Sequence, residues 1–226
     1  MSIWTRISES LAALAGGEPL SAVFERLRTP PERSVAFTIA VIALSAKMAK
    51  ADGLVTRDEV MAFREVFEIP PTEESNAAKV FNLARQDVAG FEDYAKRIKA
   101  MFNADEATLC DLMEGLFHIA MADGIFHPNE DAFLARVAQM FGLKEAQFRG
   151  LRSRFVPDAL GDPFEVLGLD PDAGLAAAHA AWQMLVREMH PDQMIARGVP
   201  QEAVKMAEKR LVAINLAWEE IQKASV

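Results

Sequence analysis

Apolar residues recur at helical spacing along almost the whole chain of 226 residues. Trp4, Ile7, Leu11 and Leu14 already show this spacing, and almost no segment alternates polar and apolar residues as a half-buried strand does. The pattern predicts an all-α protein, and its 51% hydrophobic content is enough to bury a sizeable core. Before the C-terminal quarter, helices are expected near residues 3–14, 20–28, 31–51, 57–68, 73–87, 91–102, 105–122, 129–141 and 145–155.

Composition excludes several classes of protein. The net charge of -9 comes without a clustered basic patch, which argues against nucleic-acid binding. Cys110 is the only cysteine, so neither an internal disulfide nor a cysteine-based zinc site is expected. The most apolar run, residues 34–46, is too short to span a bilayer and predicts a central helix that is buried all round. We therefore expect a cytoplasmic protein with no transmembrane segment.

Three regions are expected. Residues 1–29 form a helical extension whose apolar face suits packing on the rest of the protein, a dimer seam or a membrane surface. Packing is favoured, because the polar face offers little basic charge for lipids. Residues 30–156 and 162–226 are separated by Pro157–Pro163, where two prolines and a glycine interrupt the helical pattern.

The middle region contains an internal repeat. An apolar helix ends in Ala-Asp-Gly twice, with Asp52 and Asp123 as the aspartates and a displacement of 71 residues. Glu59 and Glu130 each follow seven positions later. The repeat predicts two related helical hairpins packed as a bundle.

These four carboxylates have two interpretations. In the first, the glycine after each aspartate ends a helix and the glutamate caps the next one, in one copy as the Thr56–Glu59 capping box. In the second, Asp52, Glu59, Asp123 and Glu130 converge on a divalent cation such as Ca²⁺. Capping is favoured, because the spacing of these carboxylates departs from that of an EF-hand loop. The protein is therefore not expected to require a cofactor.

The C-terminal region predicts a helical hairpin. Asp162 and Pro163 start a short helix, residues 175–189 form an alanine-rich one, and the last helix runs from Gln201 to about Lys223. His190, Pro191 and Asp192 end the second helix and open a loop through residue 200, so the three side chains are expected at the hairpin tip. An ordinary helix end, with the histidine on the helix dipole, is the alternative.

The two Ala-Asp-Gly turns and their glutamates resemble the TerB-like (tellurite-resistance) domain, an all-helical fold, over about residues 30–155. The segments DPFEVLGLDPDA, LVREMHPD, IARGVP and LVAINLAWEEI together resemble the J-domain of DnaJ-type (Hsp40) co-chaperones, over about residues 162–224. The long loop that ends in Gly-Val-Pro, placed after a TerB-like domain, is most similar to the DjlA-like type.

This resemblance implies a co-chaperone rather than an enzyme. In J-domains the His-Pro-Asp motif contacts an Hsp70 (DnaK-type) partner and stimulates its ATP hydrolysis, a role that would fall to His190, Pro191 and Asp192, with Arg187 and Gln193 beside them. The TerB-like region would recognise unfolded or specific client proteins, or a local site. The competing hypothesis is a cation-binding stress adaptor whose J-like segment has lost its partner. A hydrolase is poorly supported, because no nucleophile lies in a glycine elbow.

One feature departs from the J-domain pattern. J-domains carry several basic residues on the second helix, but only Arg187 is strongly basic here, and Gln193 stands where lysine commonly follows the motif. Residues 159–226 hold six Lys and Arg against ten Asp and Glu, a net charge of -4. Electrostatic steering toward an acidic partner is therefore expected to be weak.

Overall fold

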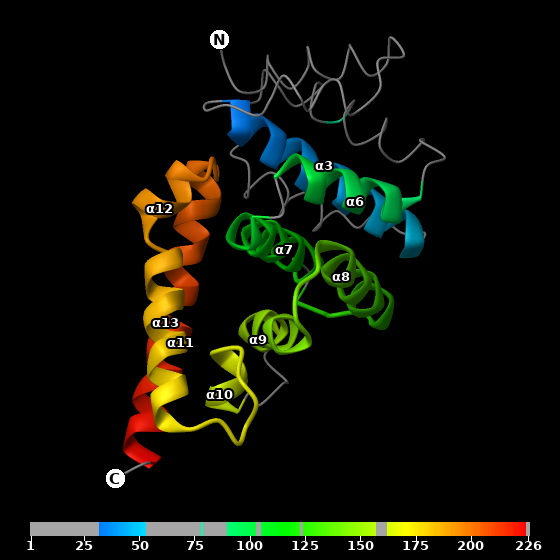
Figure 1. Ribbon diagram of the computed structural model, residues 1–226. Coiled ribbons are helices and arrows are strands. Elements are labelled where there is room, and N and C mark those ends of the chain that lie inside the picture. The colour runs from blue at the N-terminus through cyan, green and yellow to red at the C-terminus, as the bar shows by residue number, and fades with distance from the viewer. Residues whose placement is uncertain are drawn as a thin grey trace.

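The computed structural model describes residues 32–52, 78, 90–102, 105–122, 124–156 and 162–224, and these residues form helices, turns and loops without a strand. The prediction of an all-α fold is confirmed. Figure 1 shows a group of helices around α3, with a long hairpin of α11 and α13 standing beside it and α12 at one end of that hairpin. The helices expected at 3–14, 20–28, 57–68 and 73–87 lie outside the described residues, apart from residue 78.

Helix α3 (Glu32–Asp52) is the centre of the larger group. Every residue from 35 to 48 is buried, including Lys47, whose ammonium group lies over the ring of Tyr94 at 4.9 Å from its centroid. A helix that is apolar on all sides gains most when it is surrounded by other helices. The prediction of a central, fully buried helix is confirmed.

The helices packed around α3 begin and end close to the predicted residues. They are α6 (Phe91–Met101), α7 (Glu106–Ala120) and α8 (Pro128–Phe141), and α9 (Glu145–Phe155) packs on α7. α7 and α8 form the second of the two predicted hairpins. Gly124, in the turn between them, has the left-handed φ of 79° expected for a glycine just past a helix end.

Helix α10 (Pro163–Val166) follows the predicted linker and packs directly on α9. The carboxylate of Asp162 accepts a hydrogen bond from the Phe164 amide at 2.9 Å, as an N-cap should. The contact with α9 is unusually close. A Cβ atom at Gly150 would lie 2.8 Å from the Gly168 Cα atom, so only glycine allows the two backbones to approach this far.

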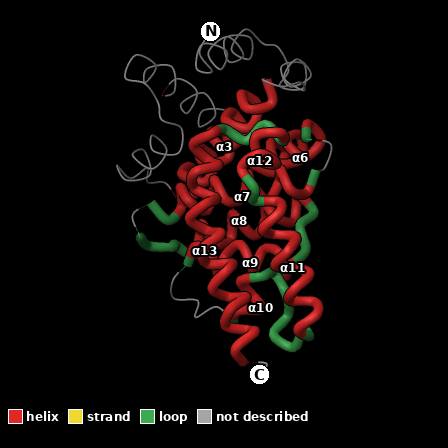
Figure 2. The backbone as a smooth tube through the Cα atoms, turned by 90° about the vertical axis from the view of Figure 1, so that its left-hand side faces the viewer, coloured by secondary structure: helices red, strands yellow, loops and turns green. Residues whose placement is uncertain are grey.

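Helices α11 (Leu175–Glu188) and α13 (Gln201–Ala224) form the C-terminal hairpin, which faces the viewer in Figure 2. Their small core includes Ala178, Leu185 and Ile214, and the Trp182 indole N–H donates to Asn215 across the hairpin at 2.9 Å. The expected loop after His190 is corrected: residues Pro191–Ala196 form a helix, α12. Proline is excluded from a helix interior but suits the first position, where no amide donor is needed.

None of the helices among the described residues is long and apolar enough to cross a membrane. The prediction of a cytoplasmic protein was wrong, because the absence of a membrane-spanning helix does not identify a compartment. A chain without a spanning helix can still be held at a membrane by an amphipathic helix or a lipid anchor. No compartment is therefore assigned.

Candidate functional site

The His-Pro-Asp segment forms the corner between α11 and α12. The Met189 amide donates to the Leu185 carbonyl at 2.9 Å, which closes the end of α11. His190 then takes extended backbone angles (φ -64°, ψ 131°) and becomes the N-cap of α12, with Pro191 at its first position. The Asp192 amide donates to His190 Nδ1 at 3.2 Å, so the neutral imidazole carries its proton on Nε2.

The two ionisable side chains of this corner face solvent. The His190 side chain is 58% exposed and the Asp192 side chain 86% exposed, and their Nδ1 and Oδ2 atoms are 3.8 Å apart. Their backbones are nevertheless held by the helix cap and by the proline ring. The corner therefore presents an imidazole and a carboxylate in a restrained geometry, which lowers the entropy lost on binding a partner.

A shallow groove runs from this corner along α11. Four of the five residues predicted to contact a partner line it together: Arg187, His190, Asp192 and Gln193. Pro191 forms the first turn of α12 behind them. Sequence reasoning missed the rest of the wall, which comes from Trp182, Gln183 and Val186. Helical spacing was an available signal, because Trp182, Val186 and His190 succeed one another every four residues.

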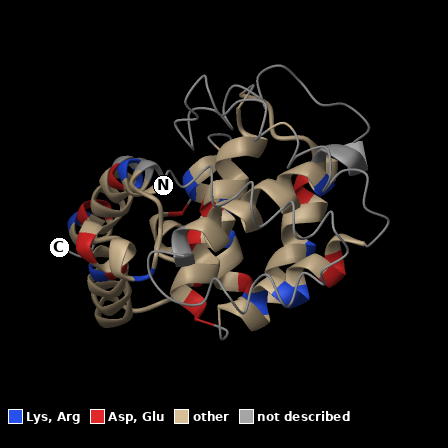
Figure 3. Ribbon diagram, turned by 90° about the horizontal axis from the view of Figure 1, so that it is seen from above, with Lys and Arg blue, Asp and Glu red and all other residues tan. Residues whose placement is uncertain are grey.

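The exposed face of α11 is nearly uncharged. Six residues of this helix are exposed and carry no permanent charge: Ala176, Ala177, His179, Ala180, Gln183 and Met184. The view from above in Figure 3 shows acidic and basic residues interspersed on the hairpin. The His179 ring stacks on both Trp182 and Trp218, with centroids 5.7 and 5.1 Å away. This face offers aromatic and apolar contacts more than charge.

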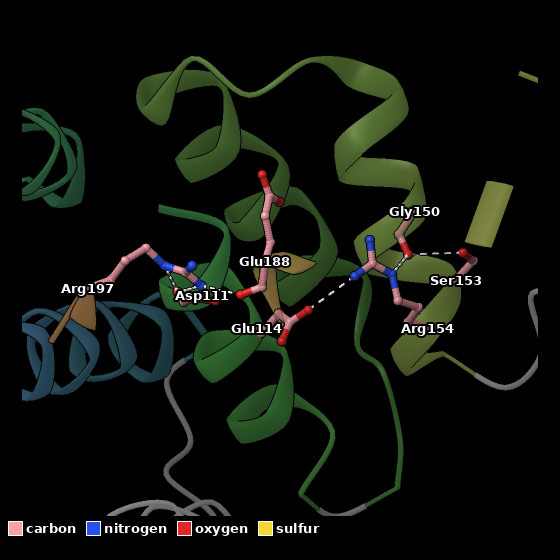
Figure 4. Close-up of polar contacts among 7 residues, drawn as sticks. All are labelled: Asp111, Glu114, Gly150, Ser153, Arg154, Glu188 and Arg197. Carbon is pink, nitrogen blue, oxygen red and sulfur yellow. Dashed lines mark hydrogen bonds and ion pairs between the residues drawn. The ribbon is translucent and has the colours of Figure 1, made fainter. Parts of the chain in front are cut away.

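On the inner side of the corner, Arg197 joins three helices. It follows α12 directly, and its Nε and Nη2 atoms donate to Asp111 Oδ2 on α7 at 3.0 and 2.8 Å. Nη2 also donates to the carbonyl of Glu188, the last residue of α11, at 2.8 Å (Figure 4). Burial raises the pKa of Asp111 to about 7, although Arg197 opposes this shift. Neither Arg197 nor Asp111 was predicted, because 86 residues separate them.

A second buried ion pair joins α9 to α7. Arg154 on α9 and Glu114 on α7 are 3.2 Å apart, and their side chains are only 5% and 8% exposed. Arg154 Nε also donates to the Gly150 carbonyl at 2.9 Å. Both ion pairs line a cavity of about 110 Å³ that Cys110 shares. Burial raises the pKa of the Cys110 thiol to about 12, so it stays protonated and unreactive.

The acidic turns are only partly within the described residues. Glu130 is buried and accepts a hydrogen bond from the His127 amide at 2.9 Å, which is the capping role. Asp52 lies at the end of α3, and both Glu59 and Asp123 fall outside the described residues. Within the described part of the chain, His, Cys, Asp and Glu side chains form no group of three suited to a metal ion. The convergence of four carboxylates on a cation stays a prediction.

Comparison with known proteins found a matching family model and several similar proteins. The model of the family "Tellurite resistance protein TerB" matches residues 38–153. Proteins named "Co-chaperone protein DjlA" are similar to this chain over 85% of its length. Those of Vibrio parahaemolyticus and Photobacterium profundum are 25% and 26% identical to it, and the similarity covers 79% of their own length. The protein of Escherichia coli K12 is 22% identical, and the similarity covers 80% of its length. Their names state a co-chaperone role and no compartment. No solved structure matches the chain.

Proposed function

Because this chain belongs to the TerB family and is a DjlA-like protein related to J-domain co-chaperones, we propose that it binds an Hsp70-type (DnaK-type) chaperone and stimulates ATP hydrolysis by that partner. The residues that carry this role are His190, Pro191 and Asp192, with Arg187 and Gln193 beside them. In this proposal the chain regulates the ATPase of another protein and holds no catalytic group of its own.

The observation that supports the proposal best is the combination of exposure and restraint at the α11–α12 corner. The Asp192 carboxylate is 86% exposed, so it is free to accept a charge-assisted hydrogen bond from an arginine of the partner. His190 uses Nδ1 to cap α12, which leaves the Nε2 proton for donation outward. A corner held in one conformation before binding favours a specific complex.

The mechanism is allosteric. A bound protein shifts the partner's conformational equilibrium only by its different affinities for the two states. The His-Pro-Asp corner must therefore bind the hydrolysis-competent state of the Hsp70 more tightly than the resting state. Because the face of α11 is nearly uncharged, long-range attraction contributes little, and association should depend only weakly on ionic strength.

The direct test measures ATP turnover by an Hsp70 from the same organism at increasing concentrations of this protein. We expect stimulation by the wild-type chain and its loss in His190→Gln and Asp192→Asn. His127→Gln and Asp172→Asn are matched controls, because they change an exposed histidine and an exposed aspartate outside the groove. Unstimulated turnover with the wild type, or full stimulation by His190→Gln, would contradict the proposal.

The TerB-like portion, in the same proposal, recognises clients or a local site. The support is that a family model matches residues 38–153, whereas the His-Pro-Asp corner lies outside that range. Photo-crosslinking to a permanently unfolded client, such as a reduced and alkylated protein, tests this assignment. Crosslinks confined to the C-terminal hairpin would contradict it.

A further inference from the structure

The inner side of the His-Pro-Asp corner is built into the core of the TerB-like portion. Met194 of α12 and Val199 of the following turn are 2% and 4% exposed, and both belong to the same buried cluster as residues of α3 and α7. Val204 and Ala207, at the start of α13, join that cluster as well. The outer side of α12 faces solvent, as the exposure of Asp192 and Gln193 shows. The corner is thus anchored on one side and open on the other.

The polar contact at this anchor joins the separate elements. The Arg197 guanidinium places two donors on Asp111 and a third hydrogen bond on the Glu188 carbonyl. The Glu188 carbonyl is one of the last four backbone carbonyls of α11, and these carbonyls have no hydrogen-bond donor within the helix. Figure 4 shows Arg197 between Asp111 and the end of α11, so one side chain links α7, α11 and the residue after α12.

Further contacts hold the same two parts of the chain together. The Arg210 guanidinium of α13 lies over the Phe155 ring of α9, 3.5 Å from its centroid. Arg149 of α9 forms ion pairs with Asp170 and, at 3.9 Å, with Glu165. The hairpin is therefore docked along α7 and α9 without covering His190 or Asp192.

We propose that Arg197 is a positioning residue for the His-Pro-Asp corner and that the TerB-like portion, through Asp111, sets the angle between α11 and α12 at which the corner meets its partner. This inference rests on the proposed function for its activity readout. It adds that the TerB-like portion is a structural part of the partner-binding site, so that co-chaperone activity depends on the docking of two regions distant in sequence.

The test compares Arg197→Gln and Asp111→Asn with Arg136→Gln in the full-length protein. Arg136 of α8 forms an ion pair with Glu92 of α6 at 2.9 Å, and neither residue belongs to the corner or to the helices that Arg197 joins, so it is a control for loss of an arginine pair. We expect Arg197→Gln to raise the concentration giving half-maximal ATPase stimulation about tenfold, the size of effect typical of a lost charged hydrogen bond. The maximal stimulated rate should change little, because His190 and Asp192 remain.

A second readout does not depend on the partner. The amide resonance of Asp192 reports its hydrogen bond to His190 Nδ1, and it should shift in Arg197→Gln and Asp111→Asn but not in Arg136→Gln. The double variant Arg197→Gln with Asp111→Asn should be no worse than Arg197→Gln alone, because both changes remove a charge from the same Arg197–Asp111 contact. An unshifted Asp192 amide, or fully additive effects, would overturn the inference.

The two proposals fail in different ways. If the wild-type chain does not stimulate the Hsp70, the proposed function fails, while the Asp192 amide still decides whether Arg197 positions the corner. If the wild type stimulates and Arg197→Gln has wild-type half-saturation, the positioning inference fails alone. Asp111→Asn keeps the size of the side chain, so it supplies the same comparison if Arg197→Gln does not fold.

Discussion

Replacing Gly150 with alanine tests how closely the two parts of the chain are packed. A Cβ atom at this position would lie 2.8 Å from Gly168 Cα, 2.9 Å from the Glu165 carbonyl oxygen and 3.0 Å from the Gly168 nitrogen. All three are backbone atoms, which cannot rotate away as a side chain can. The variant therefore forces α9 and α10 apart or leaves an overpacked contact.

The expected size of the effect follows from two opposing contributions. Alanine within a helix is about 1 kcal/mol more favourable than glycine, which by itself would stabilise Gly150→Ala. Overpacking in a closely packed contact costs about 1–3 kcal/mol, and backbone neighbours place this site toward the upper end. We expect Gly150→Ala to lower the free energy of unfolding by about 1–2 kcal/mol.

Gly115, in the middle of α7, offers a matched control. A Cβ atom there would meet only Val41 methyl groups, at 3.5 and 3.7 Å, which is ordinary contact. Gly115→Ala should therefore keep the helix-propensity gain and be stabilised by up to about 1 kcal/mol. The two variants make the same chemical change in similar helices, so their difference isolates the contact with α10.

The measurement is urea unfolding of both variants, followed by far-ultraviolet circular dichroism. A shift of the midpoint without a change in slope reports stability. A Gly150→Ala midpoint raised as much as that of Gly115→Ala would refute the close approach of α9 to α10.

Three further outcomes are expected. Burial raises the pKa of Asp111 from 3.8 to about 7, so between these pH values the folded state holds a proton that the unfolded chain releases. The wild type should therefore lose stability relative to Asp111→Asn as pH rises, by at most about 1.4 kcal/mol per pH unit. Urea midpoints at pH 5.5 and 8 that differ equally for both proteins would contradict this. Glu130→Ala removes the acceptor for the His127 amide and should cost about 1 kcal/mol in thermal unfolding, whereas an unchanged melting temperature would count against the cap. If the acidic turns bind Ca²⁺, calorimetry should give a binding heat that Asp123→Asn abolishes, and no heat with the wild type would discard the cation site.

Local features of the sequence were sufficient for most helices. The bounds of α3, α8 and α9 agree with their apolar periodicity, because a helix and its caps involve residues only a few positions apart. The proline of the His-Pro-Asp segment correctly indicated the end of α11, but it was not recognised as the first residue of α12. A six-residue helix has too few turns to show periodicity, and proline is compatible with both a loop and a helix start.

The sequence by itself determined the helical class and the exposure of the imidazole and carboxylate at the hairpin tip, since each depends on local patterning. Only the tertiary structure decided how the hairpin meets the rest of the chain. Arg197 contacts Asp111 beneath the tip, and Gly150 of α9 lies against Gly168 in the turn after α10. Local interactions do not fix the relative orientation of helices, which is determined only when surfaces distant in sequence pack together. A buried ion pair between residues 86 positions apart, like a glycine that admits another backbone, has no signature until that packing is known.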